Sequence, residues 1–206
     1  WYQYLGNPRL TDGSGDFQQG SYLGPEFTRD YIGDFLARNH IPAVELSDED
    51  LPGRIAELVA AEKVIGWFQG RMEFGPRALG SRSIIGDARS SSMQEVMNLK
   101  IKFRESFRPF APTVLAERAR AYFDIDWESP YMLLTAPVAR RVRKSVAEQD
   151  QRLEGIDKLK VVRSEIPAVT HVDCSARLQT VSARDNPVYH RMIAKFDELY
   201  GCPVVI

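Results

Sequence analysis

Segments in which apolar residues have helical spacing alternate with short apolar runs, and this alternation limits the fold more than any other feature of the sequence. Apolar residues recur three or four positions apart in predicted helices at 27–39, 47–60, 90–100 and 187–200. Short apolar or β-branched runs predict strands at 41–46, 64–68, 110–115 and 166–172, and a last one from residue 203. Strands that alternate with helices in this way indicate an α/β domain.

The size and charge of the chain argue against several classes of protein. Its 206 residues suffice for one sizeable domain, or for one domain with an extended arm. The net charge of −1 gives no overall attraction to nucleic acid or to an acidic membrane. No apolar run approaches the ~20 residues of a membrane span, and no signal peptide opens the chain. We therefore expect a cytoplasmic protein with no membrane partner.

The termini indicate how the chain is organised. Residues 1–25 are rich in Gly, Pro, Asp, Ser and Gln, without helical or strand period, and are predicted to be an arm or interdomain connection. Residues 26–206 are predicted to form the domain. Because the chain begins without methionine and ends on an apolar run, we expect it to be part of a longer protein, truncated at its end. The charged segment 138–165 is predicted to be a solvated helix or a mobile loop.

Basic residues are concentrated between residues 66 and 112. This region holds eight basic side chains against four acidic ones, and several basic groups interrupt glycine-containing loops. Guanidinium groups bind phosphate bidentately, and loop amides can add further donors. Some arginines are expected to pair with Glu73, Asp87 and Glu105, but four acids cannot neutralise eight bases. The region therefore predicts an anion site.

A second polar cluster follows the predicted strand at 166–172. The segment 170–180 contains His171, Asp173, Ser175 and Arg177. In open α/β sheets, ligands bind at the carboxyl ends of strands, so this cluster is a second candidate. The alternative for His171 is a structural histidine with satisfied hydrogen bonds, and the alternative for Asp173 is a turn or a helix cap.

Other chemistries lack their motifs. The chain has neither GxGxxG after a strand nor GxxxxGK[ST], and no HExxH or CxxC. Cys174 and Cys202 match no metal-ligand spacing, so free thiols and no metal site are expected. Ser175 lies near His171 without a nucleophile elbow and is not predicted to be a nucleophile.

Three motifs closely resemble signatures of the NodU/CmcH-type carbamoyltransferases. They are GWFQGRMEFGPRALGSRSIIGDAR at 66–89, NLKIKFRESFRPFAP at 98–112, and HVDCSARLQTV at 171–181, which NPVY follows at 186–189. The similarity covers roughly residues 20–206, with the motifs in the order of the family. The resemblance is therefore highly specific.

The resemblance implies an enzyme of two parts. An N-terminal domain of the actin-like ATPase fold would bind iron and transfer a carbamoyl group to an acceptor hydroxyl. A C-terminal YrdC-like domain, with a twisted mixed sheet flanked by helices, would form carbamoyl adenylate from carbamoyl phosphate and ATP. This chain matches only the second part. Its expected partner is therefore the N-terminal domain, and iron is expected only there.

The resemblance also assigns roles to residues. Lys102 and Arg104 match a K-x-R pair that binds substrate anions in YrdC-type proteins. The phosphate of carbamoyl phosphate, or those of ATP, would be bound by Lys102, Arg104 and Arg108. The remaining phosphate oxygens would be bound by Arg71, Arg77 and Arg82. The carbamoyl group or the adenylate would be oriented by His171, Ser175 and Arg177.

The expected mechanism is attack of carbamate on the α-phosphate of ATP, with pyrophosphate as the leaving group. Positioning and charge stabilisation would provide the catalysis, and Mg²⁺ would arrive with ATP.

The chain departs from the family at two places. Members usually carry glycine where this chain has Cys174, and a side chain there restricts φ. Members also continue beyond the final Pro-Val strand, so nucleotide binding by this chain alone is expected to be incomplete.

Two other functions fit parts of the sequence. The basic loops could bind RNA as a YrdC-like module without catalysis, although the near-neutral charge disfavours nucleic acid. Alternatively, the arm at 1–25 could dock on the missing domain, which is compatible with an enzyme.

Overall fold

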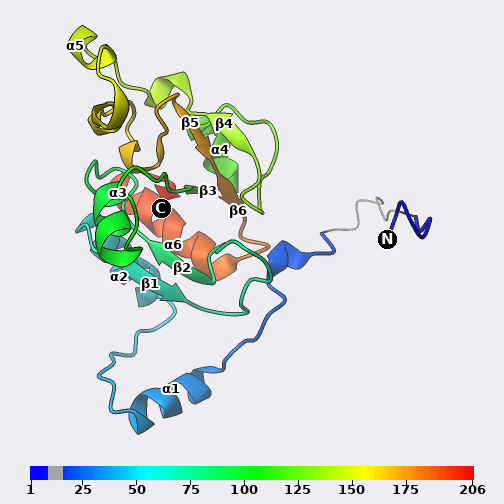
Figure 1. Cartoon of the computed structure of the whole chain (residues 1–206). Helices are drawn as coiled ribbons and strands as arrows, with labels where there is room; N and C mark the ends of the chain where they lie inside the picture. Colours follow the sequence, from blue (N-terminus) through cyan, green and yellow to red (C-terminus); the bar gives the residue numbers. More distant parts are fainter. Residues whose placement is uncertain (9–15) are drawn as a thin grey trace.

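The computed structural model describes residues 1–8 and 16–206. Six α-helices are present in this part of the chain: α1 (Arg29–Arg38), α2 (Asp50–Ala60), α3 (Met93–Val96), α4 (Ala119–Tyr122), α5 (Glu148–Gln151) and α6 (Pro187–Tyr200). The strands are β1 (Ile65–Phe68), β2 (Arg82–Ile85), β3 (Thr113–Leu115), β4 (Thr135–Pro137), β5 (Ser175–Arg177), β6 (Gln179–Val181) and β7 (Val204–Val205). Figure 1 shows their arrangement. None of the described helices is long and apolar enough to span a membrane.

The strands form small sheets that are linked end to end. β1 pairs antiparallel with β2, while β3 pairs parallel with β6 and antiparallel with β7. A bridge between Asp87 and Val205 connects the end of β2 to β7. β5 and β6 are successive parts of one extended run, and β4 pairs antiparallel with β5. The prediction of an α/β domain with a mixed sheet flanked by helices is confirmed.

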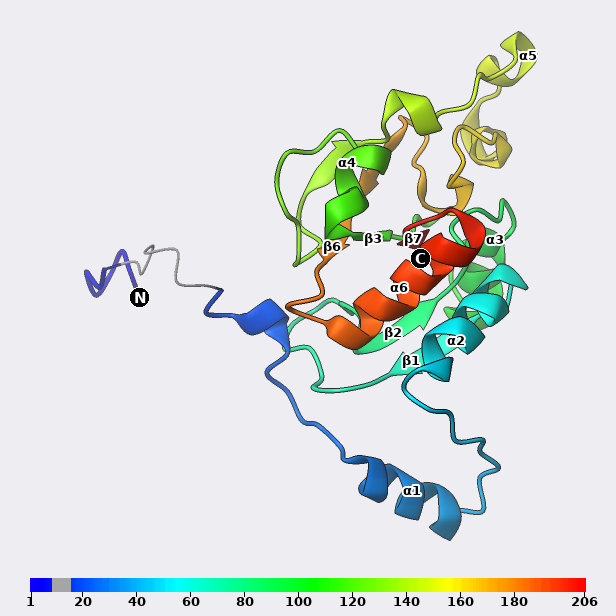
Figure 2. The same cartoon turned by 180° about the vertical axis from the view of Figure 1, so that it is seen from behind.

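The core lies between the sheet and two helices. α2 and α6 lie side by side (Figure 2) and bury Val59 and Phe196 against strand residues such as Val114 and Val204. α6 has strong local signals at both ends. The Asn186 side chain accepts a hydrogen bond from the backbone at its N-terminus, and Gly201 ends it at φ +69°.

By contrast, α1 buries no residue. Thr28 caps it through a hydrogen bond from the Tyr31 amide to Oγ1 (3.2 Å). Its apolar side chains Tyr31, Ile32 and Phe35 remain exposed, and both views show the helix apart from the core (Figures 1 and 2). The helix was correctly predicted from its periodicity, although its apolar face packs on no core.

Two predicted strands are wrong. Residues 41–46 form no strand and connect α1 to α2. The segment 166–172 instead contains the 3₁₀ turn Pro167–Val169, because proline fixes φ and supplies no N–H for a ladder. Ala168 and Val169 are buried within this turn, so their apolar character reflects burial and not strand formation. The strand comes later, at β5 and β6, where none was predicted.

The charged segment 138–165 forms only short turns. Its elements are the 3₁₀ turn Arg140–Val142, the single turn of α5 and the 3₁₀ helix Gly155–Lys160. Val142 is buried, whereas most of the charged side chains face solvent, in agreement with the predicted solvated surface.

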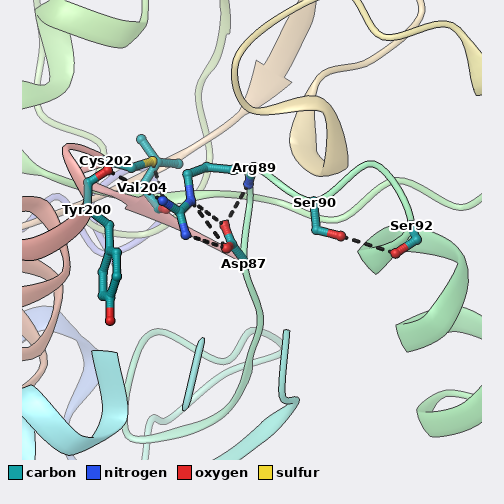
Figure 3. A network of polar contacts seen from close by, with 7 residues as sticks. All are labelled: Asp87, Arg89, Ser90, Ser92, Tyr200, Cys202 and Val204. Carbon is teal, nitrogen blue, oxygen red and sulfur yellow. Dashed lines mark hydrogen bonds and ion pairs between the residues drawn. The ribbon is translucent and has the colours of Figure 1, made fainter. Parts of the chain in front are cut away.

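An ion pair joins the sheet to the C-terminal end of α6 (Figure 3). Asp87 is only 3% exposed and accepts hydrogen bonds from Arg89 Nε at 3.0 Å and from Arg89 Nη2 at 2.7 Å. The same guanidinium lies 4.8 Å from the centre of the Phe196 ring. Two of the structural ion pairs expected from the sequence, Asp87–Arg89 and Glu105–Arg108, are thus present.

The two thiols are free, as predicted. Cys202 lies next to this ion pair, and its Sγ donates to the Val204 carbonyl (3.5 Å; Figure 3). Burial raises the pKa of Cys202 to about 12, so this thiol stays protonated at neutral pH. Cys174 lies in the turn before β5 with φ +61°, the left-handed conformation that glycine adopts without strain.

Replacing Arg89 by methionine should lower the free energy of unfolding by about 2–3 kcal/mol, because it leaves the Asp87 carboxylate buried without its partner. The value lies below that of a fully buried pair because the Arg89 side chain is 31% exposed. Urea denaturation measures the change. Arg120→Met is the control, since its pair with Asp126 is exposed and should contribute less than about 0.5 kcal/mol. Equal losses in the two variants would contradict the assigned role.

Cys174→Gly should raise the free energy of unfolding by about 0.5–1 kcal/mol, because relief of the left-handed strain exceeds the entropy that glycine adds to the unfolded chain. Cys174→Ala removes the thiol but keeps Cβ, so it should change stability much less. If alanine stabilised as much as glycine, the thiol and not the backbone would be responsible.

Candidate anion-binding site

Four basic side chains line one cavity of about 250 Å³, which we call the cationic cavity. It lies between the loop 73–82, the segment 102–113, β5 and α6. Its basic residues are Arg77, Lys102, Arg104 and Arg177. No Asp or Glu side chain is among the described residues that line it. An anion that enters the cavity would therefore meet four basic side chains and no acidic side chain.

Lys102 and Arg104 reach the cavity through an unusual helix end. α3 continues as a π-helix, Met97–Ile101, and the Lys102 amide bonds to the Met97 carbonyl (2.9 Å). Phe103 then adopts φ +48° and is exposed, so that both basic neighbours face the cavity. π-helical turns recur at functional sites. Positive φ at a bulky residue is strained, and such strain clusters at functional sites.

Arg104 is held in place by its own contacts. Its Nε donates to Asn98 Oδ1 (2.6 Å), and its guanidinium lies 4.7 Å from the centre of the Phe110 ring. The Asn98 side chain in turn donates to the carbonyls of Ser106 (3.1 Å) and Arg108 (2.8 Å). These bonds leave the terminal nitrogens of Arg104 available to a ligand.

The other cations have few protein partners. Arg77 Nε is buried and has no hydrogen-bond acceptor within residues 1–8 and 16–206. Among the described residues, neither the Lys102 nor the Arg177 side chain makes an ion pair or hydrogen bond. Buried polar groups are normally satisfied, and an exception calls for an explanation such as a ligand.

A buried carboxylate shapes the loop that carries Arg77. Glu73 is 6% exposed, and its Oε1 accepts hydrogen bonds from the amides of Leu79 (2.7 Å), Ser81 (2.8 Å) and Arg82 (3.2 Å). The sequence had suggested Glu73 only as an ion-pair partner for an arginine. Its position among apolar loop residues was the one available signal that it is buried.

The carbonyls of this loop are also satisfied. The Gly80 carbonyl accepts hydrogen bonds from Trp67 Nε1 (2.9 Å), Gln69 Nε2 (2.8 Å) and Asn186 Nδ2 (3.2 Å). Gly80 has φ +103°, and a Cβ there would lie 2.2 Å from Cδ1 of Tyr189, which also lines the cavity. Only glycine fits at this position.

A larger cavity of about 600 Å³ lies next to the cationic one, and Pro109 lines both. We call it the histidine cavity. Its apolar walls include Phe107, Leu159 and Val172, and it contains His171. It is larger than the cationic cavity but lacks that cavity's concentration of cations.

The electrostatics of the histidine cavity favour a neutral imidazole beside a charged carboxylate. Burial lowers the pKa of His171. Asp173 accepts hydrogen bonds from the Ser175 hydroxyl (2.7 Å) and amide (3.0 Å), and these bonds lower its pKa. Ser175 Oγ lies 3.4 Å from His171 Nδ1. His171 and Asp173 precede β5, while Ser175 and Arg177 lie in it, so this cluster is not at the carboxyl end of the strand as predicted.

Three predicted arginines lie outside the lining of the cationic cavity. Arg108 pairs with Glu105 at 3.2 Å on the surface. Arg71 donates to the Gly24 carbonyl (3.2 Å) and lies 3.7 Å from Glu26.

Arg82 is engaged by the backbone. Its guanidinium donates to four carbonyls: those of Gln69 (2.9 Å), Ser81 (3.0 Å), Gly70 (3.1 Å) and Pro25 (3.4 Å). It also lies 3.6 Å from the centre of the Phe68 ring. These contacts favour a structural role for Arg82.

Comparison with known proteins places the chain in a family. A family model described as carbamoyltransferase C-terminus matches residues 56–206. An uncharacterized protein of Synechocystis is 52% identical over 100% of this chain and 34% of its own length. The nodulation protein NolNO of Sinorhizobium fredii is 41% identical over 77% of this chain and 21% of its own length. The 3'-hydroxymethylcephem-O-carbamoyltransferase of Streptomyces clavuligerus is 35% identical over 89% of this chain and 30% of its own length.

The chain thus spans about a third or less of the length of these relatives. The matched segment contains all four basic residues of the cationic cavity and the whole of the histidine cavity. This chain belongs to the carbamoyltransferase C-terminal family.

Proposed function

We propose that this chain binds carbamoyl phosphate and ATP and forms carbamoyl adenylate, which is then passed to an acceptor hydroxyl. The observation that carries the proposal is the cationic cavity, which has four basic side chains, no acidic side chain and a buried Arg77 Nε with no acceptor among the described residues. Guanidinium and ammonium groups are the side chains that bind phosphate through charge-assisted hydrogen bonds. The relative from Streptomyces clavuligerus is named as a carbamoyltransferase, which agrees with this chemistry.

The reaction has two steps. Water cleaves carbamoyl phosphate to carbamate and phosphate. A carbamate oxygen then bonds to the α-phosphorus of ATP, the bond from that phosphorus to the bridging oxygen breaks, and pyrophosphate leaves. The cations stabilise negative charge on the phosphoryl oxygens, so positioning and electrostatics supply the catalysis. Mg²⁺ would enter with ATP.

Within this scheme, Arg77, Lys102, Arg104 and Arg177 hold the phosphate groups. Arg104 is the most preorganised of them, because Asn98 and Phe110 fix its guanidinium before a ligand arrives. Arg108, Arg71 and Arg82 receive no direct role, since their contacts lie elsewhere.

The histidine cavity suits the uncharged part of the nucleotide. Its mostly apolar walls can take a purine, while neutral His171 and ionised Asp173 can hydrogen-bond to the base or the ribose hydroxyls. Because Pro109 lines both cavities, the base would lie beside the phosphates of the same molecule. Ser175 would orient His171 and Asp173 instead of contacting the carbamoyl group.

Transfer to the acceptor is assigned to another part of a longer polypeptide. The relatives are about three or more times the length of this chain. An N-terminal domain of the actin-like fold, with its iron, would supply the acceptor site. The exposed apolar face of α1 is available for contact with such a domain.

Calorimetric titration with carbamoyl phosphate tests the cationic cavity. Lys102→Ala and Arg177→Ala should each weaken binding roughly tenfold or more, because each removes a charged donor worth about 1.5–3 kcal/mol. Neither substitution removes a side-chain hydrogen bond or an ion pair among the described residues, so the fold should be preserved. Circular dichroism would check this.

Arg108→Ala is the matched control, since it removes a cation from the same motif but outside the cavity, and it should change the affinity less than about twofold. Equal affinities in all variants would contradict the proposal. So would a wild-type chain that binds neither carbamoyl phosphate nor ATP with Mg²⁺. Steeply salt-dependent RNA binding would then favour the RNA-binding alternative.

A further inference from the structure

A tyrosine from outside the matched segment reaches the loop that carries Arg77. Tyr22 lies 34 residues before the first residue that the family model covers, and its hydroxyl donates to the Leu79 carbonyl (2.7 Å). The same hydroxyl accepts a hydrogen bond from Asn186 Nδ2 (3.1 Å). Burial raises the pKa of Tyr22 to about 12, so this hydroxyl keeps its proton at neutral pH.

The backbone around Tyr22 is fitted to the same loop. The Phe74 amide bonds to the Ser21 carbonyl (2.7 Å), and the Gly24 amide bonds to the Met72 carbonyl (2.9 Å). A Cβ at Gly24 would lie 2.8 Å from that carbonyl oxygen, so the approach requires glycine. Backbone hydrogen bonds on both sides of Tyr22 therefore fix the position of its ring against the loop.

Both backbone groups of Leu79 make hydrogen bonds that hold the loop in place. Its amide donates to Glu73, and its carbonyl accepts from Tyr22 and from Gln179 Nε2 (2.8 Å). Arg77 lies between these anchors, and its Nε has no hydrogen-bond partner in the part of the chain that the structure describes. The position of its guanidinium in the cavity wall therefore depends on the fixed backbone on either side.

We propose that Tyr22 is a positioning residue of the cationic cavity: its hydroxyl ties Leu79 to Asn186 and so holds the loop that presents Arg77. This inference rests on the proposed function, because it takes the cavity to be a phosphate site. It extends the site beyond residues 56–206, which the family model matches. Tyr22 acts through Arg77 and makes no contact with the substrate.

Tyr22→Phe tests the inference, since it removes the hydroxyl and leaves the ring. The dissociation constant for inorganic phosphate, measured by calorimetry, should rise about fivefold, because a loop free to move loses preorganisation. The melting temperature should fall by less than about 5 °C, because Gln179 still bonds to the Leu79 carbonyl.

Tyr122→Phe is the matched control. The Tyr122 hydroxyl is also partly buried and donates to a backbone carbonyl, that of Gly201 (3.2 Å), and its pKa is likewise raised to about 12 by burial. Tyr122 does not line the cavity. Its loss should lower the melting temperature by a similar amount without changing phosphate affinity. A purely structural role for Tyr22 predicts the same behaviour in both variants.

A double-mutant cycle with Arg77→Met tests whether Tyr22 affects phosphate binding through Arg77. If Tyr22 acts through Arg77, Tyr22→Phe should weaken phosphate binding in the wild-type background but not in the Arg77→Met background. Equal effects in the two backgrounds would overturn the positioning role, as would unchanged affinity in Tyr22→Phe. A wild-type chain that fails to bind phosphate would instead overturn the proposed function.

Discussion

The carboxylate of Glu73 is almost fully removed from water, and the candidate site depends on how the protein satisfies it. Burying a carboxylate is costly unless hydrogen bonds compensate. The loop bends so that the amides of Leu79, Ser81 and Arg82 all donate to one oxygen of Glu73. The loop thereby closes on itself between β1 and β2 without regular secondary structure, and Arg77 is carried on its closed part.

The outer side of this loop joins the first and the third of the sequence motifs. Donors to the Leu79 and Gly80 carbonyls come from β1 and the residue following it, from β6, and from the N-cap of α6. These two motifs are therefore adjacent in space, although more than a hundred residues separate Gly80 from Asn186. This explains why Gln179 and Asn186, which carry no charge, lie within motifs that otherwise suggest anion binding.

The spacing of apolar residues correctly located the helices and strands whose apolar side chains lie on one face. α1, α2, α6 and β1 lie where apolar spacing placed them, because each has a simple pattern and clear ends. The strand predicted at 166–172 failed because buried apolar residues also occur in irregular segments.

At the site, the sequence identified the cations but could not separate them by role. Arg82 and Arg77 belong to the same motif, yet one donates to four carbonyls while the other retains an unpaired nitrogen. Only the path of the backbone distinguishes the two. The roles of Glu73 and Tyr22 were missed for the same reason, since Glu73 bonds to backbone amides, and Tyr22 bonds to a backbone carbonyl and to the distant Asn186.

The hydrogen bond between Tyr22 and Asn186 links residues 164 positions apart, and this has a consequence for folding. Contacts between residues so far apart in the sequence form late, because closing a large loop costs chain entropy before the new contact stabilises the structure. During synthesis, the Arg77 loop cannot acquire its complete set of supports until the start of α6 has left the ribosome. The cationic cavity is therefore expected to be among the last parts of the chain to assemble, and unfinished chains should lack it.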